Sequence, residues 1–310
     1  MFILEFVLQT NGLTKSYKKN KVLNGVTMNI RRGDIYGFVG ENGSGKTTVI
    51  RLITGLIYAD SGEFTLFGVK NSDPEIREAR SKVGAIVESP SIYLNMSARD
   101  NLMMQSSILG IHDEEKCHSI LKTVGLGELW GAKKHAGDFS LGMRQRLGIA
   151  MALLGDPEFI ILDEPMNGLD PAGIVEIREL ILHLNRNMGI TFLISSHILT
   201  ELALVATNYG IISHGRLIKE ITASELEGVC PHTIEIKTED IDATMSLLAP
   251  ILKEGSLRQI DDSVRIDGDI DINAILGKII NANIKITSVV SYRSSIEDYY
   301  LSMMGGGNNA

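Results

Sequence analysis

The stretch IYGFVGENGSGKTTVI, residues 35–50, decides the fold class of this chain. An apolar run typical of a buried strand leads into a glycine-rich turn, and a helix is predicted to begin near Lys46. Gly40 to Thr47 matches the pattern G-x-x-x-x-G-K-[ST]. Glycines let backbone N–H groups approach phosphate oxygens, and the helix N-terminus adds the positive end of its dipole. The order strand, loop, helix therefore predicts a phosphate-binding loop in an α/β domain.

The side chains of this loop have expected roles. Lys46 is expected to reach the β- and γ-phosphates, and Thr47 is expected to bind Mg²⁺. A chance glycine-rich turn is the alternative, but the strand and helix patterns on either side disfavour it. The residues expected to bind the nucleotide here are Gly40, Glu41, Asn42, Gly43, Ser44, Gly45, Lys46, Thr47 and Thr48.

A second buried strand is predicted at FIILDEP, residues 159–165, because its apolar run is continuous. The carboxyl ends of such strands are where open α/β sheets bind ligands. Asp163 is therefore expected to hold Mg²⁺, and Glu164 to polarise the attacking water as a general base. An apolar strand that ends in acids is common, so the assignment depends on its pairing with the phosphate loop.

Two more strands are predicted at the same sheet edge. ITFLISSH, residues 190–197, ends in His197, which we expect to contact the γ-phosphate. A solvated loop histidine is the ordinary alternative. SKVGAIVE, residues 81–88, ends in Glu88, which we expect to bind the metal and to act as a catalytic residue beside the attacking water.

These motifs occur along the chain together with FSLGMRQR at residues 139–146 and NGLD at residues 167–170. Their order resembles that in the ATP-binding subunit of ABC transporters. The resemblance covers residues 8 to about 225. It implies a P-loop NTPase fold with a mixed sheet and a helical subdomain, and ATP and Mg²⁺ as cofactors. The family's signature motif would lie from Phe139 to Met143. Ser140 and Gly142 would then bind the γ-phosphate held by a second subunit.

The resemblance implies roles for two further residues. Tyr17 lies where the family has an aromatic ring that stacks on adenine, although a strand-edge tyrosine without a role is the alternative. Asp170 matches the loop that approaches the opposite subunit's site, and the same residues are also good turn formers. The chain departs from the family pattern at Leu141, where glycine is usual, and at Met143, where glutamine is frequent.

Glu88 is the most informative departure, because the family usually has glutamine there. Only glutamine can donate a hydrogen bond, and glutamate adds a negative charge near the metal. With the segment SPSIYLNMSARDNL that follows it, Glu88 is similar to the bacitracin-resistance and lantibiotic-immunity branch of these ATPases. Members of that branch remove or counter peptide antibiotics that act on the cell envelope.

Residues from about 89 to 154 are predicted to be helical. Ser97 and Asp100 have the spacing of a capping box at the start of one helix. The resemblance makes this region the subdomain that receives a coupling helix from a membrane-spanning partner. The side chains expected to line that groove are Ile92, Tyr93, Leu94 and Met96, with an ordinary core role as the alternative.

Composition excludes several classes of function. The formal net charge of −8 and the pI near 5.4 argue against a nucleic-acid surface, since phosphate backbones attract clustered Lys and Arg. Cys117 and Cys230 are the two cysteines and have no C-x-x-C spacing, which excludes a disulfide framework. The apolar start MFILEFVLQTNGL is too short for a span and lacks the features of a signal peptide, so we expect a cytoplasmic protein.

The last part of the chain is expected to form a separate unit. Beyond residue 230 it carries 12 acidic and 7 basic side chains, a clear shift in charge. Its pattern predicts strand, helix, strand, strand, helix, strand, which fits a small ferredoxin-like α+β sandwich. We expect an ATP-binding domain at 1–227, an accessory domain at 228–304 that includes a closing helix, and a disordered tail at 305–310.

The sequence therefore predicts an ATPase subunit that forms a homodimer around two ATP molecules and drives a separate multi-span permease. It would lie on the inner face of the cell membrane through that permease. Three alternatives stay open at this point. They are an ABC-type ATPase without a permease, the ATPase of a peptide-sensing permease complex, and a nucleotide-binding regulator without turnover.

Overall fold

The structure, a computed structural model, describes residues 5–229, 232–253, 255–268 and 270–293. The chain divides into two compact units, Met1–Ala223 and Ser224–Ala310. The boundary expected at residue 227 lies within α8 (Ala223–Val229). The closing helix and the disordered tail expected from residue 294 onward lie outside the described residues, as does Cys230.

A six-stranded sheet forms the centre of the first unit, in the order β11-β10-β4-β9-β8-β7. All neighbouring strands are parallel except β10 and β11, which pair in opposite directions. β4, β8 and β9 are buried along their whole length, which explains their continuous apolar sequences. The strands are β4 (Ile35–Val39), β7 (Val83–Ile86), β8 (Phe159–Asp163), β9 (Thr191–Ser196), β10 (Asn208–Ser213) and β11 (Arg216–Thr222).

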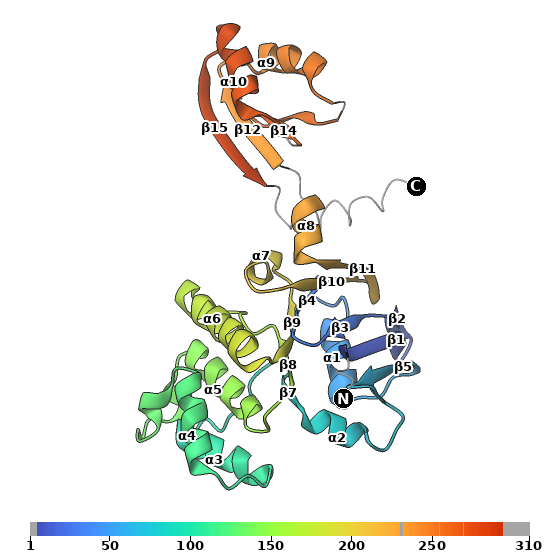
Figure 1. The fold of residues 1–310 in the computed structure, drawn as a ribbon, viewed down its shortest axis with the longest axis vertical. Helices are drawn as coiled ribbons and strands as arrows, with labels where there is room; N and C mark the ends of the chain where they lie inside the picture. Colours follow the sequence, from blue (N-terminus) through green and yellow to red (C-terminus); the bar gives the residue numbers. More distant parts are fainter. Residues whose placement is uncertain (1–4, 230–231, 254, 269, 294–310) are drawn as a thin grey trace. The chain divides into compact units, whose positions relative to one another are not determined.

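An antiparallel sheet has the strand order β2-β1-β5-β6, with β3 also paired to β1. It covers the side of α1 (Lys46–Thr54) that faces away from the central sheet. One buried cluster joins residues of this sheet to Ile50 and Ile53 of α1, and to Phe38 and Phe159 of the central sheet. Helix α1 is thus held between two sheets (Figure 1). The remaining elements here are β1 (Phe6–Tyr17), β2 (Asn20–Val26), β3 (Asn29–Arg31), β5 (Ser61–Leu66), β6 (Val69–Lys70) and α2 (Ile76–Ser81).

Helices α3 to α6 gather on the side of β7 and β8 that faces away from the antiparallel sheet (Figure 1). They are α3 (Ala98–Ile108), α4 (Glu114–Thr123), α5 (Leu141–Leu153) and α6 (Pro171–Met188). Each begins at a residue whose side chain accepts a hydrogen bond from the first turn, namely Ser97, Asp113, Ser140 and Asp170. Within the described ranges, no helix combines the length and the apolar character that a membrane crossing requires.

The second unit follows the order of elements expected from the sequence. Its four strands form an antiparallel sheet in the order β13-β14-β12-β15, and α9 and α10 complete its buried core. The ferredoxin-like assignment of this unit stays a prediction. The elements are β12 (His232–Thr238), α9 (Ile241–Leu248), β13 (Leu257–Ile260), β14 (Ser263–Asp267), α10 (Ile272–Asn281) and β15 (Ile286–Arg293).

Candidate active site

The phosphate loop joins β4 to α1 in the middle of the central sheet. Gly43 and Gly45 have positive φ angles, +82° and +113°, which side chains rarely allow. A Cβ atom at Gly40 would lie 2.3 Å from the carbonyl oxygen of Ile212, so no side chain fits there either. Gly45 caps α1 without any side-chain hydrogen bond, which leaves the N–H groups of the first turn to a ligand. The backbone thus forms a concave row of donors.

Ser44 provides a direct test of whether this loop fits a phosphate. Its Oγ is buried and has no hydrogen-bond partner within the described residues. Buried polar atoms are nearly always satisfied, so an unpaired hydroxyl within a row of backbone donors indicates a place for an anionic ligand. A nucleotide phosphate meets this requirement.

Lys46 lies beneath the loop with only 5% of its surface exposed. Its Nζ donates to the carbonyl oxygens of Gly40 at 2.6 Å and Glu41 at 3.3 Å, and lies 3.3 Å from Oε1 of Glu164. The ammonium group is therefore held by two backbone carbonyls and a carboxylate.

Asp163 ends β8 and is almost fully buried, with 2% exposure. Its Oδ2 accepts a hydrogen bond from the Thr47 hydroxyl at 2.9 Å, and its Oδ1 accepts one from the Ser195 hydroxyl at 2.5 Å. Thr47 and Asp163, two of the three side chains expected to hold Mg²⁺, are therefore in direct contact. Ser195, which sequence reasoning missed, fixes the carboxylate from the neighbouring strand.

Glu164 follows at a φ of +51°. Its N–H donates to the Ser195 hydroxyl at 2.9 Å, and its Oε2 lies 2.5 Å from Nδ1 of His197. One carboxylate oxygen thus faces Lys46 and the other faces the histidine. Because Nδ1 is engaged by Glu164, Nε2 of His197 is left for a ligand.

Glu201 is a second residue that the sequence analysis missed. It lies on α7 (Leu199–Leu202), directly after His197, and lines a small hollow with Glu164 and Ser196. Burial raises the pKa of its carboxyl group; a smaller effect from His197 lowers it and one from Glu164 raises it. The sequence could have identified Glu201 only if it had predicted a helix directly after His197 that brings this side chain back toward Glu164.

Glu88 lies apart from this group. It follows the end of β7 at a φ of +64°, its side chain is 61% exposed, and its carboxylate forms an ion pair with Arg51 of α1. The structure therefore gives Glu88 an arginine as its partner and does not join it to Asp163 or Glu164. Tyr17, at the end of β1, is half exposed, and Lys15 lies 6.0 Å from the centre of its ring.

Ser140 and Asp170 cap two neighbouring helices. The Ser140 hydroxyl accepts from the N–H of Met143 at 3.2 Å, and Asp170 accepts from the N–H of Gly173 at 3.1 Å. A Cβ atom at Gly142 would lie 3.8 Å from the Cα of Gly173, so the two helix starts are close together. Among the described residues, no hydrogen bond links Ser140, Gly142 or Asp170 to the phosphate loop.

Comparison with known proteins agrees with this geometry. A family model described as ABC transporter matches residues 23–167, and one described as AAA domain, putative AbiEii toxin, Type IV TA system matches residues 133–203. The bacitracin transport ATP-binding protein BcrA of Bacillus licheniformis is 40% identical over 308 residues, which cover 97% of this chain and 98% of that protein. The lantibiotic transport ATP-binding protein SrtF of Streptococcus pyogenes is 43% identical over 221 residues, covering 71% of this chain and 93% of that protein.

Solved structures of ATP-binding cassettes match about seven tenths of the chain. A nucleotide-free ATP-binding cassette from an ABC transporter has a TM-score of 0.65 and 27% identity, covering 72% of this chain and 94% of that one. The ADP conformation of another such cassette has a TM-score of 0.64 and 28% identity, covering 71% of this chain and 92% of that one.

Proposed function

The chain belongs to the ATP-binding subunits of ABC transporters, whose ATP hydrolysis is coupled to transport, and from this premise we propose that it powers removal of a peptide antibiotic. The observation that carries the proposal is similarity along almost the full chain to a bacitracin transport ATP-binding protein. The similarity to a lantibiotic transport ATP-binding protein over 71% of the chain supports the same class of cargo.

The site contacts support a specific order of events. A γ-phosphate entering the loop offers Lys46 a stronger partner than the Gly40 carbonyl and the Glu164 carboxylate that now hold it. When Lys46 turns to the phosphate, the carboxylate of Glu164 is released from this ion pair and can receive the proton of the attacking water. His197 keeps Glu164 oriented through Nδ1, which leaves Nε2 of the ring to contact the phosphate.

Mg²⁺ is part of the proposal. Among the described residues, no group of three or more His, Cys, Asp or Glu side chains could hold a metal ion. Mg²⁺, however, needs few protein ligands when phosphates supply the rest, and a hydroxyl and a carboxylate are oxygen donors of the right kind. Thr47 and Asp163 would hold the ion, which neutralises charge on the phosphates. Glu88 would join them after leaving Arg51.

A second copy of the chain would complete each site. Ser140, Gly142 and Asp170 lie at adjoining helix starts and make no hydrogen bond to their own phosphate loop among the described residues. A helix N-terminus with free N–H groups favours an anion. We propose that Ser140 and Gly142 bind the γ-phosphate held by the partner, that Asp170 approaches the same site without binding the phosphate, and that Tyr17 stacks on adenine.

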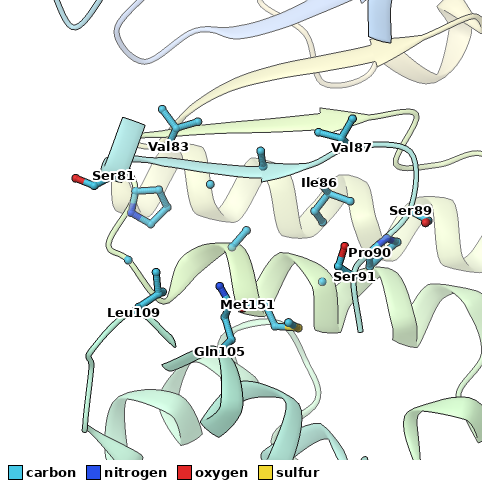
Figure 2. A pocket seen from close by; sticks show the side chains of 16 residues that line it. Ser81, Val83, Ile86, Val87, Ser89, Pro90, Ser91, Gln105, Leu109 and Met151 are labelled. Carbon is cyan, nitrogen blue, oxygen red and sulfur yellow. The ribbon is translucent and has the colours of Figure 1, made fainter. Parts of the chain in front are cut away.

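The permease would dock beside β7. A hollow of about 210 Å³ lies between the unpaired edge of β7 and helices α3 and α5, with Ile86, Pro90, Leu109 and Met151 in its lining (Figure 2). Two bulky side chains in the loop before α3, Tyr93 and Leu94, are 47% and 53% exposed. A hollow with both polar and apolar lining, together with exposed aromatic and aliphatic side chains in the loop before α3, would suit a helical segment of a membrane protein. This contact would hold the chain at the inner face of the membrane.

Complementation of a bacitracin-sensitive strain of the host that lacks this chain tests the proposal. The wild-type chain should restore growth in bacitracin or in a lantibiotic. Glu164→Gln should bind ATP but hydrolyse none and restore no growth. Restored growth with Glu164→Gln would remove Glu164 as the base, and no rescue by the wild-type chain would remove the antibiotic from the proposal. Affinity capture from detergent-solubilised membranes, followed by mass spectrometry, would identify the permease.

A further inference from the structure

Asn101 is fully buried in α3 and holds the loop of residues 93–97, which we name the docking loop. Its Nδ2 donates to the carbonyl oxygens of Tyr93 at 3.0 Å and Ser97 at 2.9 Å, and to that of Met96 at 3.4 Å. Its Oδ1 accepts from the N–H of Tyr93 at 2.7 Å. Both backbone groups of Tyr93 are thus bound by one amide, a pattern that neither Asp nor a hydrophobic residue can reproduce.

The other side of the docking loop is held by the segment that leads into the signature helix. The N–H of Ala136 donates to the carbonyl oxygen of Met96 at 2.8 Å, and the N–H of Gly137 donates to that of Leu94, also at 2.8 Å. The backbones of Ser97 and His135 form an isolated antiparallel bridge. The docking loop therefore lies between Asn101 and residues 135–137, bonded to both.

The segment from Ala136 to Ser140 is short and conformationally constrained. Residues 136–138 form one tight 3₁₀ turn, Phe139 is buried, and Ser140 is the N-cap of α5. A shift of the docking loop therefore shifts Ser140 unless buried hydrogen bonds break, and leaving such groups unpaired is costly. The loop presents Tyr93 and Leu94 outward while its backbone faces the signature segment.

We infer that Asn101 is a positioning residue that joins the docking loop to the signature segment, so that a permease contact on Tyr93 and Leu94 sets the position of Ser140. The inference rests on the proposed function, because it assumes that Ser140 binds ATP held by a second copy. It assigns Asn101 no contact with ATP. Its effect is on assembly of the two-chain site and not on the phosphate loop.

The test uses the full chain carrying Glu164→Gln, in which ATP stays bound. In this parent, Asn101→Asp removes the hydrogen bonds that Nδ2 donates and leaves the acceptor. Asn185→Asp is the matched control, because the Asn185 amide also donates to two backbone carbonyls, those of Gly33 and Ile190, away from the loop. Two quantities are measured: binding of a fluorescent ATP analogue to the monomer, and the ATP-dependent dimer dissociation constant by analytical ultracentrifugation.

Asn101→Asp should raise the dimer dissociation constant about tenfold, equivalent to about 1.4 kcal/mol, while analogue binding to the monomer stays within about twofold. Hydrogen exchange at Ala136 and Gly137 should accelerate in the same variant. The Asn185→Asp control should match the parent. Unchanged dimerisation of a folded Asn101→Asp chain overturns the inference, as does an equal loss of analogue binding, which would indicate a merely structural role.

A second variant covers the case in which Asn101→Asp does not fold. Ala136→Pro removes the N–H that bonds Met96, and Pro suits this position because His135 before it is extended and Ala136 begins a 3₁₀ turn. It should weaken dimerisation by a similar factor, and normal dimerisation would overturn the inference. A parent that stays monomeric in saturating ATP contradicts the proposed function and the inference with it. A dimeric parent with dimeric variants contradicts the inference alone.

Discussion

Replacing Ser195 with alanine tests how the two acids at the end of β8 are held. Ser195 is fully buried on β9, and its register partner in the sheet is Asp163 of β8. Its hydroxyl donates to Oδ1 of Asp163 at 2.5 Å and accepts from the N–H of Glu164 at 2.9 Å. One oxygen atom therefore positions both the expected metal ligand and the expected base.

The size of the effect follows from these bonds. A hydrogen bond to a charged group contributes about 1.5–3 kcal/mol, and Asp163 is too buried for water to replace the lost donor. If about 2 kcal/mol of this is lost from the transition state, kcat falls about 30-fold. The substitution leaves the phosphate loop unchanged. The KM for ATP should therefore change by less than about threefold, which is less than about 1 kcal/mol of binding free energy.

Steady-state hydrolysis and thermal unfolding of Ser195→Ala measure both quantities. Ser196→Ala is the matched control: Ser196 is also buried on β9, but its hydroxyl bonds the backbone of Ile198 and not the acids. The control should lose about 1 kcal/mol of stability and keep its kcat. Equal kcat for Ser195→Ala and the wild type, or equal losses in both variants, would refute the reasoning.

Three more variants probe the site. Glu88→Gln should raise the Mg²⁺ concentration for half-maximal hydrolysis about threefold or more, and it should change stability by less than about 1 kcal/mol because its ion pair is exposed; an unchanged Mg²⁺ requirement removes Glu88 from the metal site. Glu201→Gln should have a higher melting temperature than the wild type at pH 7 and the same melting temperature at pH 4. The pKa of the Glu201 carboxyl is raised on folding, so the wild-type protein loses stability as pH rises from 4.5 through the pKa of the folded state. Equal melting temperatures at both pH values would argue against a raised pKa at Glu201. Gly45→Ala should weaken fluorescent ATP analogue binding at least about tenfold, since its φ is +113° and the new Cβ would lie 2.6 Å from Leu23; titration that finds wild-type affinity contradicts the strain.

The parts of the fold that depend on short-range pattern could be predicted from the sequence. Buried parallel strands have continuous apolar runs, so β4, β8 and β9 and the polar residues that follow them were evident. The strands of the antiparallel sheet were harder to predict from the sequence. Asn11-Gly12 has the sequence of a hairpin turn, yet both residues lie inside β1, where the pairing to β5 shifts register and Gly12 takes a φ of +65°.

The contacts that set the site depend on long-range arrangement. Ser195 faces Asp163 only because β9 inserts between β4 and β8, an order that does not follow the sequence. A serine in a buried strand carries no signal of that role. Likewise, nothing near Glu88 predicts Arg51 as its partner, because the two lie on different elements. The roles of the site residues stay predictions until the variants are measured.

The central claim is that the signature segment of one chain completes the ATP site of another. Its most direct test is the molar mass of Glu164→Gln with and without ATP, by multi-angle light scattering, alone and combined with Ser140→Arg. The account predicts that ATP doubles the mass of Glu164→Gln, and that the double variant binds ATP with the same affinity but stays a monomer. A double variant that doubles its mass in ATP, or one that loses ATP as a monomer, would contradict the account.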